Sequence, residues 1–349
     1  MKTKGKIVLT VLGLIIFLLA AAGTYLYSQI SPMAQGDEVR FEVAQGTSVR
    51  KIAIDLKEAG IIKNDNFFYY YVRKPSLFAF LFKDITVQEP VVLKSGIYHI
   101  APGLNYAQIV NILISGQQEY IKVSIPEGKT ITQTAQILED AGICNLIDFK
   151  NVCYDSKFVS SFGIPAQSAE GYLFPDTYFL TSGMTAQEVA ALMIQTFFQK
   201  AAEIPGLLEK STQELYDTVI LASIVEREYR VEEEAPLIAS VFTNRLRRGI
   251  GLYSCATIVY ILTEIEGRPH PDRVLLEDTK IDSPYNTYKW AGLTPGPISN
   301  PGLVALNAAA NPPKTNYYFF QVADSAAGKH VFTTTFDEHK ATHNLNTKK

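Results

Sequence analysis

The sequence predicts an α+β protein in which a single N-terminal membrane helix precedes small α/β modules and a larger mixed α+β domain. Three observations predict this class. The chain begins with an apolar segment long enough to cross a bilayer, it then repeats a strand–glycine–helix pattern three times, and its second half alternates helical periods with short strand patterns. With 349 residues and 47% hydrophobic content, the chain has room for one large domain or two to three small ones.

The first predicted element is a transmembrane helix over residues 7–27. Lys2, Lys4 and Lys6 precede this span, and no other charged residue occurs before Asp37. About 21 residues at about 1.5 Å per residue are enough to cross a hydrocarbon core of about 30 Å. Because the lysines lie only before the span, we expect residues 1–6 in the cytoplasm and the rest of the chain on the periplasmic or extracytoplasmic side of the inner (cell) membrane.

A cleaved signal peptide is the alternative interpretation of this span, because Ala20, Ala21 and Ala22 offer a small-residue cleavage site. The apolar stretch continues through Leu26, however, and is longer than a usual signal core. The sequence therefore favours an uncleaved single-pass anchor.

The repeated pattern occupies residues 43–56, 100–113 and 125–138. Each copy is typical of a short strand, a glycine turn and an amphipathic helix, and its unequal spacing excludes a regular solenoid. Such units resemble LysM, a short module that binds the GlcNAc-containing glycan of cell walls. We therefore expect a LysM-like region over residues 38–120, and the alternative is a module that only packs or positions the next domain above the membrane.

The second half, residues 121–349, is predicted to form the larger domain. Thr185 is placed as a helix N-cap with Glu188 three residues later, which predicts a helix from there to Ala202. Residues 281–302 are dense in Pro, Gly, Asn and aromatic residues, which is typical of an ordered functional loop. The other predicted elements are a strand entering a turn at 170–178, helices at 213–229, from 233 or 236 to 248, at 256–266 and at 303–310, a hairpin of 317–323 with 330–335, and a final helix.

Glu226 is the candidate catalytic acid. It follows the apolar run 219–225, which is typical of a helix buried on all sides. A carboxylate at the edge of such a core is partly desolvated, and this raises its pKa from about 4.3 toward the range of about 6–7 that suits a general acid. The alternative is a helix that simply passes from core to solvent, with Glu226 and Glu228 at its wet end.

The candidate substrate-binding residues come from the aromatic loop, from the string at 170–178 and from the helix that follows Glu226. Tyrosine faces stack on sugar C–H surfaces, asparagine amides bond hydroxyls, and an arginine binds carboxylates or hydroxyls. These candidates are Glu170, Tyr172, Asn244, Arg245, Tyr285, Asn286 and Tyr288.

Other chemistries lack support. A net charge of −3 argues against a nucleic-acid partner. The three cysteines have no CxxC spacing; Cys144 and Cys153 could pair in an oxidising compartment, and Cys255 is expected to be a buried thiol. His339 and His343 are four residues apart without a suitable third ligand. We therefore expect no metal and no cofactor.

Several strings in the chain resemble those of the endolytic murein transglycosylases, the YceG-like family. The resemblance covers nearly the whole chain, with one N-terminal span, LysM-like modules and then the catalytic domain. The strings are IPEG at 125–128, EGYLFPDTY at 170–178, LASIVERE at 221–228, ASVFTNRL at 239–246, SPYNTY at 283–288, GLTPGPISNPG at 292–302, KTNYYFF at 314–320 and GKHVFTTTFDEH at 328–339.

This resemblance implies that Glu226 carries the reaction, since the family's catalytic Glu falls on the first acid of the IVERE string. It implies non-hydrolytic cleavage of the MurNAc–GlcNAc bond within peptidoglycan strands, with 1,6-anhydroMurNAc ends and no cofactor. It also implies a role in ending nascent glycan strands beside the peptidoglycan synthases. The chain departs from the family at Cys255-Ala256, where an Asp-Pro pair is frequent, which puts in doubt a carboxylate role there.

Two alternatives stay open at this point. A muramidase-type hydrolase would need a second carboxylate near Glu226, for which Glu170 and Asp176 are the only candidates carried by a motif. A non-enzymatic peptidoglycan-binding anchor would use only the LysM-like units.

Overall fold

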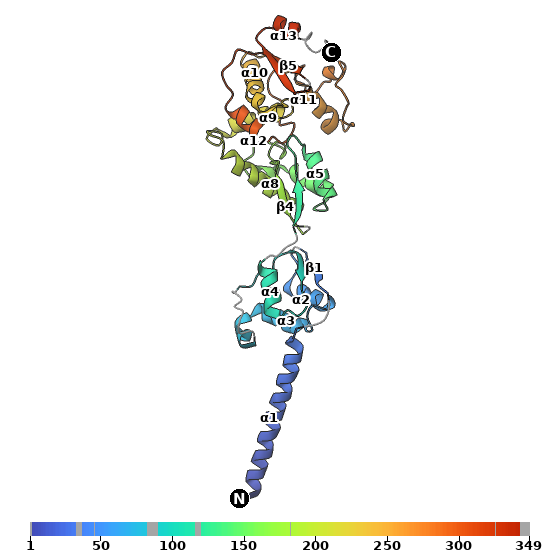
Figure 1. Ribbon diagram of the computed structural model, residues 1–349, viewed down its shortest axis with the longest axis vertical. Coiled ribbons are helices and arrows are strands. Elements are labelled where there is room, and N and C mark those ends of the chain that lie inside the picture. The colour runs from blue at the N-terminus through green and yellow to red at the C-terminus, as the bar shows by residue number, and fades with distance from the viewer. Residues whose placement is uncertain are drawn as a thin grey trace. The chain divides into compact units, whose positions relative to one another are not determined.

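The computed structural model describes residues 2–32, 37–44, 46–81, 90–115, 120–181, 183–324 and 326–342. The fold is mixed α+β, mostly helical with small two-stranded sheets, which agrees with the predicted class (Figure 1). Two compact units make up the chain. One is Met1–Ile121 with Thr181–Met184, and the other is Lys122–Leu180 with Thr185–Lys349.

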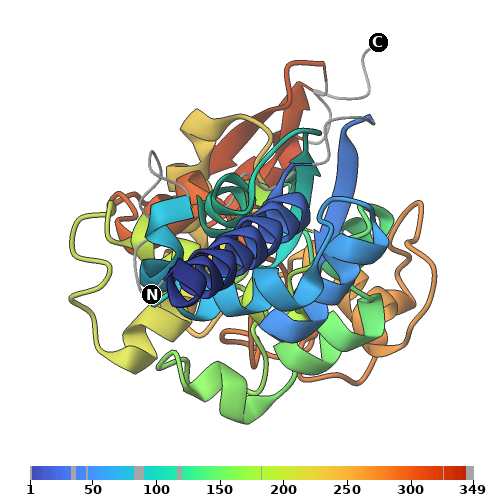
Figure 2. The same cartoon turned by 90° about the horizontal axis from the view of Figure 1, so that it is seen from below.

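The chain begins with one long apolar helix, α1 (Lys2–Ile30), drawn in dark blue and viewed close to its axis in Figure 2. Its segment Gly13–Ile30 has a mean hydropathy of 1.6, and Phe17 is 68% exposed. Within the described ranges, this is the one helix long and apolar enough to cross a membrane. Exposed apolar side chains along a helix are suited to contact with lipid.

The first two copies of the repeat share one antiparallel sheet in the first unit. β1 (Val39–Val43) pairs with β2 (Gly96–Ile100), with Phe41 opposite Tyr98. The helices that follow each strand bury their apolar faces in a common core with the sheet. These helices are α2 (Val49–Glu58), α3 (Asp65–Arg73), the 3-10 helix Pro75–Leu81 and α4 (Tyr106–Ser115).

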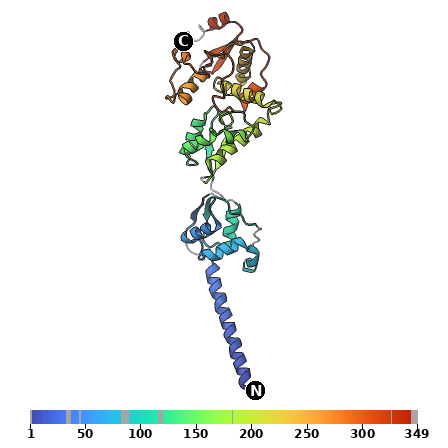
Figure 3. The ribbon, with the colours of Figure 1, turned by 180° about the vertical axis from the view of Figure 1, so that it is seen from behind.

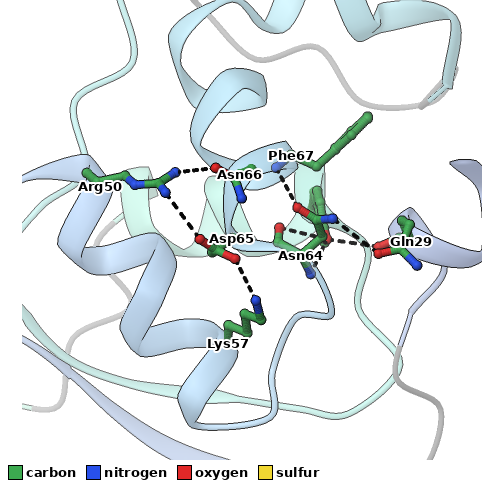
Figure 4. Close-up of polar contacts among 8 residues, drawn as sticks. Gln29, Arg50, Lys57, Asn64, Asp65, Asn66 and Phe67 are labelled. Atoms are coloured by element: carbon green, nitrogen blue, oxygen red, sulfur yellow. Dashed lines mark hydrogen bonds and ion pairs between the residues drawn. The ribbon is translucent and has the colours of Figure 1, made fainter.

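A polar cluster fastens the end of α1 to this unit (Figure 4). Asn64 caps α3, accepting a hydrogen bond from the Phe67 N–H at 2.9 Å, and its amide donates to the Gln29 side chain at 3.1 Å. Asp65 is paired with Lys57 at 2.8 Å and with Arg50 at 3.5 Å. The bond from Asn64 to Gln29 holds the last turn of α1 against α3, and the ion pairs of Asp65 hold α3 against α2.

The second unit opens with the third copy of the repeat. β3 (Ile121–Ser124) pairs with β4 (Thr177–Leu180), and α5 (Ile131–Asp140) begins after the glycine turn at a Thr130 capping box. Helices α6 (Leu146–Cys153), α7 (Ser156–Ser160) and α8 (Ala186–Ala201) follow. The predicted Thr185–Glu188 capping box is present at the start of α8.

The rest of this unit packs around α9 (Thr212–Val225), in which every residue from Thr218 to Val225 is buried. α10 (Ala235–Arg247) and α12 (Leu303–Ala310) pack against α9. Figure 3 shows the terminal hairpin of β5 (Phe319–Asp324) and β6 (Lys329–Thr333) beside α10. The remaining elements are α11 (Cys255–Tyr260), a π-helical turn Ile261–Ile265, short 3-10 helices at Glu232–Glu234 and Asp278–Lys280, and α13 (Phe336–Thr342).

Three details of the sequence prediction were wrong. Residues 170–176 form turns rather than the predicted strand, with Gly171 at a φ of 87°, and β4 begins only at Thr177. The central helix ends at Val225 rather than near Tyr229, because the Arg227 and Glu228 amides bond to carbonyls three residues back and tighten the chain into a turn. Cys255 is exposed rather than buried, because it starts α11 ahead of the buried Thr257 and Ile258. The structure holds all three cysteines, Cys144 and Cys153 included, as free thiols.

Candidate active site

Glu226 lies in the turn at the end of α9, half-buried. Its Oε2 accepts a hydrogen bond from the Gly302 N–H at 2.9 Å, and its Oε1 accepts one from the Tyr229 hydroxyl at 3.3 Å. Burial raises the pKa of Glu226 to about 7, although both hydrogen bonds oppose the rise. A carboxyl group with this pKa can both donate and accept a proton near neutral pH.

Two other segments converge on the turn that carries Glu226. One is the glycine turn Ile125–Gly128, and the other is the loop that ends at Gly302. The Gly128 N–H donates to the Asn300 carbonyl at 2.9 Å, and Arg227 Nη1 donates to the Gly128 carbonyl at 3.0 Å. The three strings IPEG, IVERE and SNPG are therefore in direct contact, although they are far apart in sequence.

Buried hydroxyls lock the loop before Gly302 onto α9. The Ile298 N–H donates to Ser223 Oγ at 3.0 Å, and Ser299 Oγ donates to the Ser223 carbonyl at 3.0 Å. Ser223 and Ser299 are fully buried, so water does not compete for these bonds. Gly302 therefore presents its N–H to Glu226 from a fixed backbone.

Glu170 is buried beside Asn300, which belongs to the loop that ends at Gly302. It is 2% exposed, and its carboxylate accepts hydrogen bonds from the Ile131 N–H at 3.1 and 3.2 Å and from Asn300 Nδ2 at 3.0 Å. Burial raises the pKa of Glu170 to about 8. Asn300 Oδ1 also accepts from the Leu173 N–H at 2.9 Å, so Glu170 and Asn300 join the start of α5, the EGYLFPDTY string and the SNPG string.

Three of the other predicted binding residues have their side chains occupied inside the protein. Tyr172 packs its ring on Phe197 at 4.7 Å in the core. Asn244 Nδ2 donates to two backbone carbonyls at 3.0 Å, and Asn286 Nδ2 donates to the Thr279 and Ile281 carbonyls at 3.0 and 2.7 Å. The structure therefore gives these side chains supporting contacts and does not bring them to Glu226.

Arg245 and Tyr288 line a pocket of about 730 Å³ whose lining does not include Glu226. Arg245 Nε donates to the Tyr318 carbonyl at 2.7 Å, and Tyr288 contacts Cys255 Sγ at 3.0 Å. Glu228 also lines this pocket and accepts a short hydrogen bond from Ser254. The pocket is otherwise rich in aromatic side chains, namely Phe242, Tyr253, Phe319, Phe320, Phe336, His330 and His339.

Tyr285 belongs to a different contact. Its ring lies 5.1 Å from that of Tyr260, and its hydroxyl would be 3.0 Å from a Cβ placed on Gly296. The glycine at 296 therefore leaves room for this ring. Tyr285 does not line the pocket of Arg245 and Tyr288, although Tyr285 and Tyr288 pack against the same small apolar cluster.

Sequence reasoning missed Glu127, Tyr229, Asn300 and Gly302. Glu127 and Gly302 lie in the IPEG and SNPG strings, which were the available signal, but no local pattern predicts that two such distant turns meet. No group of three His, Cys, Asp or Glu side chains suited to a metal occurs in the part of the chain that the structure describes, and His343 lies outside that part.

The model of the YceG-like family matches residues 41–344. The chain belongs to the YceG-like family. This span contains every segment that meets at Glu226.

Two bacterial proteins that are similar to this chain share one name. A Bacillus subtilis (strain 168) protein named endolytic murein transglycosylase is 31% identical over 344 residues, which cover 92% of this chain and 89% of the relative. A Streptococcus pneumoniae (strain D39) protein of the same name is 27% identical, and the match covers 85% of this chain and 56% of that longer protein. The crystal structure of a putative YceG-like protein from Listeria monocytogenes matches with a TM-score of 0.57 and 29% identity, over 88% of this chain and 99% of that one.

Proposed function

We propose that the chain is a membrane-anchored lytic transglycosylase that cleaves the MurNAc–GlcNAc bond within peptidoglycan strands. Membership of the YceG-like family and the name of the Bacillus relative support this activity. The observation that carries the mechanism is Glu226, whose pKa burial raises to about 7 and whose two oxygens are held by Gly302 and Tyr229. Such a group is a proton donor and, after donation, a proton acceptor.

The proposed reaction uses one carboxyl group twice. Glu226 donates its proton to the oxygen between MurNAc C1 and GlcNAc C4 as the C1–O bond breaks. The Glu226 carboxylate then takes the proton of the MurNAc C6 hydroxyl, whose oxygen closes on C1. The products are a GlcNAc with a free 4-hydroxyl and a 1,6-anhydroMurNAc end, and no water is consumed.

The residues around Glu226 have supporting roles in this proposal. The Gly302 N–H fixes Oε2, which leaves the Oε1 side to the substrate and Tyr229. Arg245 and Tyr288 are proposed to contact glycan from the aromatic pocket, and Tyr285 from the loop. Glu170, Tyr172, Asn244 and Asn286 are proposed to act on the substrate only through the backbone they hold.

The muramidase-type hydrolase remains the second candidate, because a specific observation favours it. A second carboxylate, Glu127, lies near Glu226 and raises its pKa further. Hydrolases with two carboxylates use the second one on water or on the covalent intermediate. Products decide between the two reactions, since hydrolysis yields reducing ends and transglycosylation yields anhydro ends.

We propose that α1 remains as an uncleaved anchor, with residues 1–6 in the cytoplasm and the catalytic unit on the outer side of the inner membrane. The flanking lysines and the apolar length of α1 support this orientation. The first unit, with its two strand–glycine–helix copies, is proposed to bind glycan as a LysM-like region. Cleavage inside strands, beside the peptidoglycan synthases, would then end nascent chains.

The test of the activity is digestion of purified, unlabelled glycan strands by the full-length protein, followed by mass analysis. Wild-type protein should release fragments with anhydro ends, and Glu226→Gln should release none while it still binds the strands. Cleavage by the Glu226→Gln variant at the wild-type rate would remove Glu226 from the mechanism. Binding without cleavage by either protein would favour the non-enzymatic anchor.

A further inference from the structure

Gly302 has a backbone conformation that does not need glycine. Its φ of −80° and ψ of 180° are open to any residue. A Cβ placed on it, however, would lie 2.6 Å from Glu127 Cγ, far inside van der Waals contact. Glycine at this position therefore makes room for the Glu127 side chain.

The space that Gly302 leaves brings Glu127 to the neighbourhood of Glu226. The Gly302 N–H binds Glu226 Oε2 at 2.9 Å, so one residue touches both acids. From the other direction, a Cβ on Gly128, the neighbour of Glu127, would lie 3.5 Å from Glu226 Cγ. The turn that carries Glu127 is thus packed directly against the candidate acid.

Electrostatics agree with this packing. Burial is the main cause of the raised pKa of Glu226, and the Glu127 carboxylate acts in the same direction. Burial and the neighbouring Glu226 are the main causes of the raised pKa of Tyr229, which donates to Glu226, and Glu127 adds a smaller rise. The packing at Gly302 and Gly128 therefore places Glu127 beside the site, and the effect of its charge on the pKa of Glu226 follows from that position.

We propose that Glu127 is a positioning residue for the reaction proposed above: its carboxylate, held in the space beside Gly302, lies next to Glu226 and keeps that acid able to donate its proton. The proposal rests on the proposed function. In it Glu127 acts through Glu226 and does not itself transfer a proton or bond to the sugar.

The other groups facing Glu226 act in the opposite direction. The Gly302 N–H from the loop, and Tyr229 and Arg227 from its own turn, all favour the carboxylate. Arg227 directs its Nη1 to the Gly128 carbonyl at 3.0 Å rather than to Glu226. Without Glu127, burial alone would have to offset the lowering of the Glu226 pKa by these three groups.

The expected effect follows from the sign of this interaction. Removing a like charge favours ionisation, so Glu127→Gln should lower the pKa of Glu226. The protonated form of Glu226, which donates the proton, is then lost at a lower pH than in the wild-type protein. The alkaline limb of kcat/KM against pH, which reports the acid in the free enzyme, should move down by roughly half to one pH unit. At pH 8 this corresponds to a loss of about three- to tenfold, since one pKa unit is a factor of ten.

The experiment measures kcat/KM from pH 4 to 9 for full-length protein in detergent micelles acting on purified glycan strands, with product masses recorded at each pH. Glu127→Gln has the shape of the native side chain, and Glu127→Asp keeps the charge and should return the alkaline limb toward its wild-type position. Glu209→Gln, which removes an exposed acid elsewhere in the same unit, is the control and should leave the profile unchanged. Thermal unfolding of each variant confirms that it is folded.

Three results would overturn the inference. The first is an unshifted alkaline limb in Glu127→Gln, and the second is an equal shift in Glu209→Gln. The third is a loss of activity in Glu127→Gln by the same factor at every pH, which would assign Glu127 a direct catalytic part. Failure of the proposed function looks different, because the wild-type protein itself would then yield no anhydro ends.

Discussion

Glu226 illustrates how a single side chain acquires its chemistry from its surroundings. Its oxygens are bonded by one backbone N–H and one phenol, and burial at the end of α9 holds its pKa near 7. Glu228, two residues later, is half-buried, bonds to Ser254 and lines the pocket of Arg245 and Tyr288. The tight turn after Val225 is what sends these two acids to different places.

Some features of single residues could be predicted from the sequence, and others could not. The apolar run ending at Glu226 correctly predicted a buried helix with an acid at its edge, because burial follows composition. The contact of Glu127 with Gly302 was not predictable, since it joins turns that no local period connects. The contacts of Asn244 and Asn286 were not predictable either. Asn244 donates to the carbonyl of Tyr317, far away in the sequence, and Asn286 donates to the carbonyl of Ile281 in its own loop.

Glu170 carries a prediction about stability. Its folded pKa of about 8 is above the ordinary value of 4.5, so the folded state holds this proton more tightly than the unfolded chain does. Stability is then fully present below about pH 4.5 and is lost as the pH rises through about 8. Glu170→Gln removes this dependence, so the fall in Tm between pH 5 and 8 should be smaller by roughly 5 °C than in wild type.

Thermal unfolding followed by circular dichroism at several pH values measures this difference. Glu209→Gln, at an exposed position, should give a Tm curve parallel to that of the wild-type protein. A Glu170→Gln curve that is also parallel to wild type would contradict the assigned role of Glu170.

At the scale of elements, the site depends on how α9 meets the loop before Gly302. Ser223 on α9 bonds Ile298 and Ser299, and Gly171 leaves space where Pro297 approaches Val219. The sequence predicted the position of most helices and of the hairpin, because capping boxes and periodicity are local signals. It extended α9 too far, since an apolar period cannot distinguish the last helical turn from a tighter turn. Gly128 and Gly302, which are far away in the sequence, bond to the side chains of that turn.

Gly171 provides the test at this scale. Its φ is +87°, and an added Cβ would lie 2.6 Å from Pro297 Cγ and 2.8 Å from Val219 Cγ1. Gly171→Ala combines backbone strain with a steric clash and should destabilise the protein by about 3 kcal/mol or more. The matched control is Gly163→Ala, which has a similar φ of +77° but open space around it and should cost only about 1–2 kcal/mol.

Urea unfolding of both variants measures the difference between them. Equal losses in free energy of unfolding would mean that the contact of Gly171 with Pro297 and Val219 is not a tight one in solution.

At the scale of the whole molecule, the chain joins an apolar helix, a small α/β unit and a larger unit that carries the site. Gln29 at the end of α1 accepts a hydrogen bond from Asn64, and Ile30 is buried, so the last turn of α1 packs within the first unit. The sequence predicts an apolar span, small α/β modules and a larger domain in this order, from the span, the repeated pattern and the motif strings. It did not predict that the first unit includes the last turn of α1, because this depends on single side-chain contacts.

Cys255 gives a direct test of the proposed topology. It is exposed, whereas Cys153 is buried and burial raises the pKa of the Cys144 thiol to about 11. A membrane-impermeant maleimide should therefore label Cys255 in spheroplasts without lysis, and Cys255→Ser should remove the label. Labelling that requires lysis would reverse the proposed orientation, and a labelled protein lacking residues 1–22 would show that α1 is a cleaved signal.

The central claim is that Glu226 performs a non-hydrolytic cleavage, and the mass of the products tests it most directly. Full-length protein is incubated with purified glycan strands in water enriched in ¹⁸O, and the new ends are identified by mass spectrometry. Wild-type protein should give 1,6-anhydroMurNAc ends without ¹⁸O, and Glu226→Gln should lower the rate at least about 100-fold. Reducing ends that contain ¹⁸O, or undiminished cleavage by Glu226→Gln, would contradict the account.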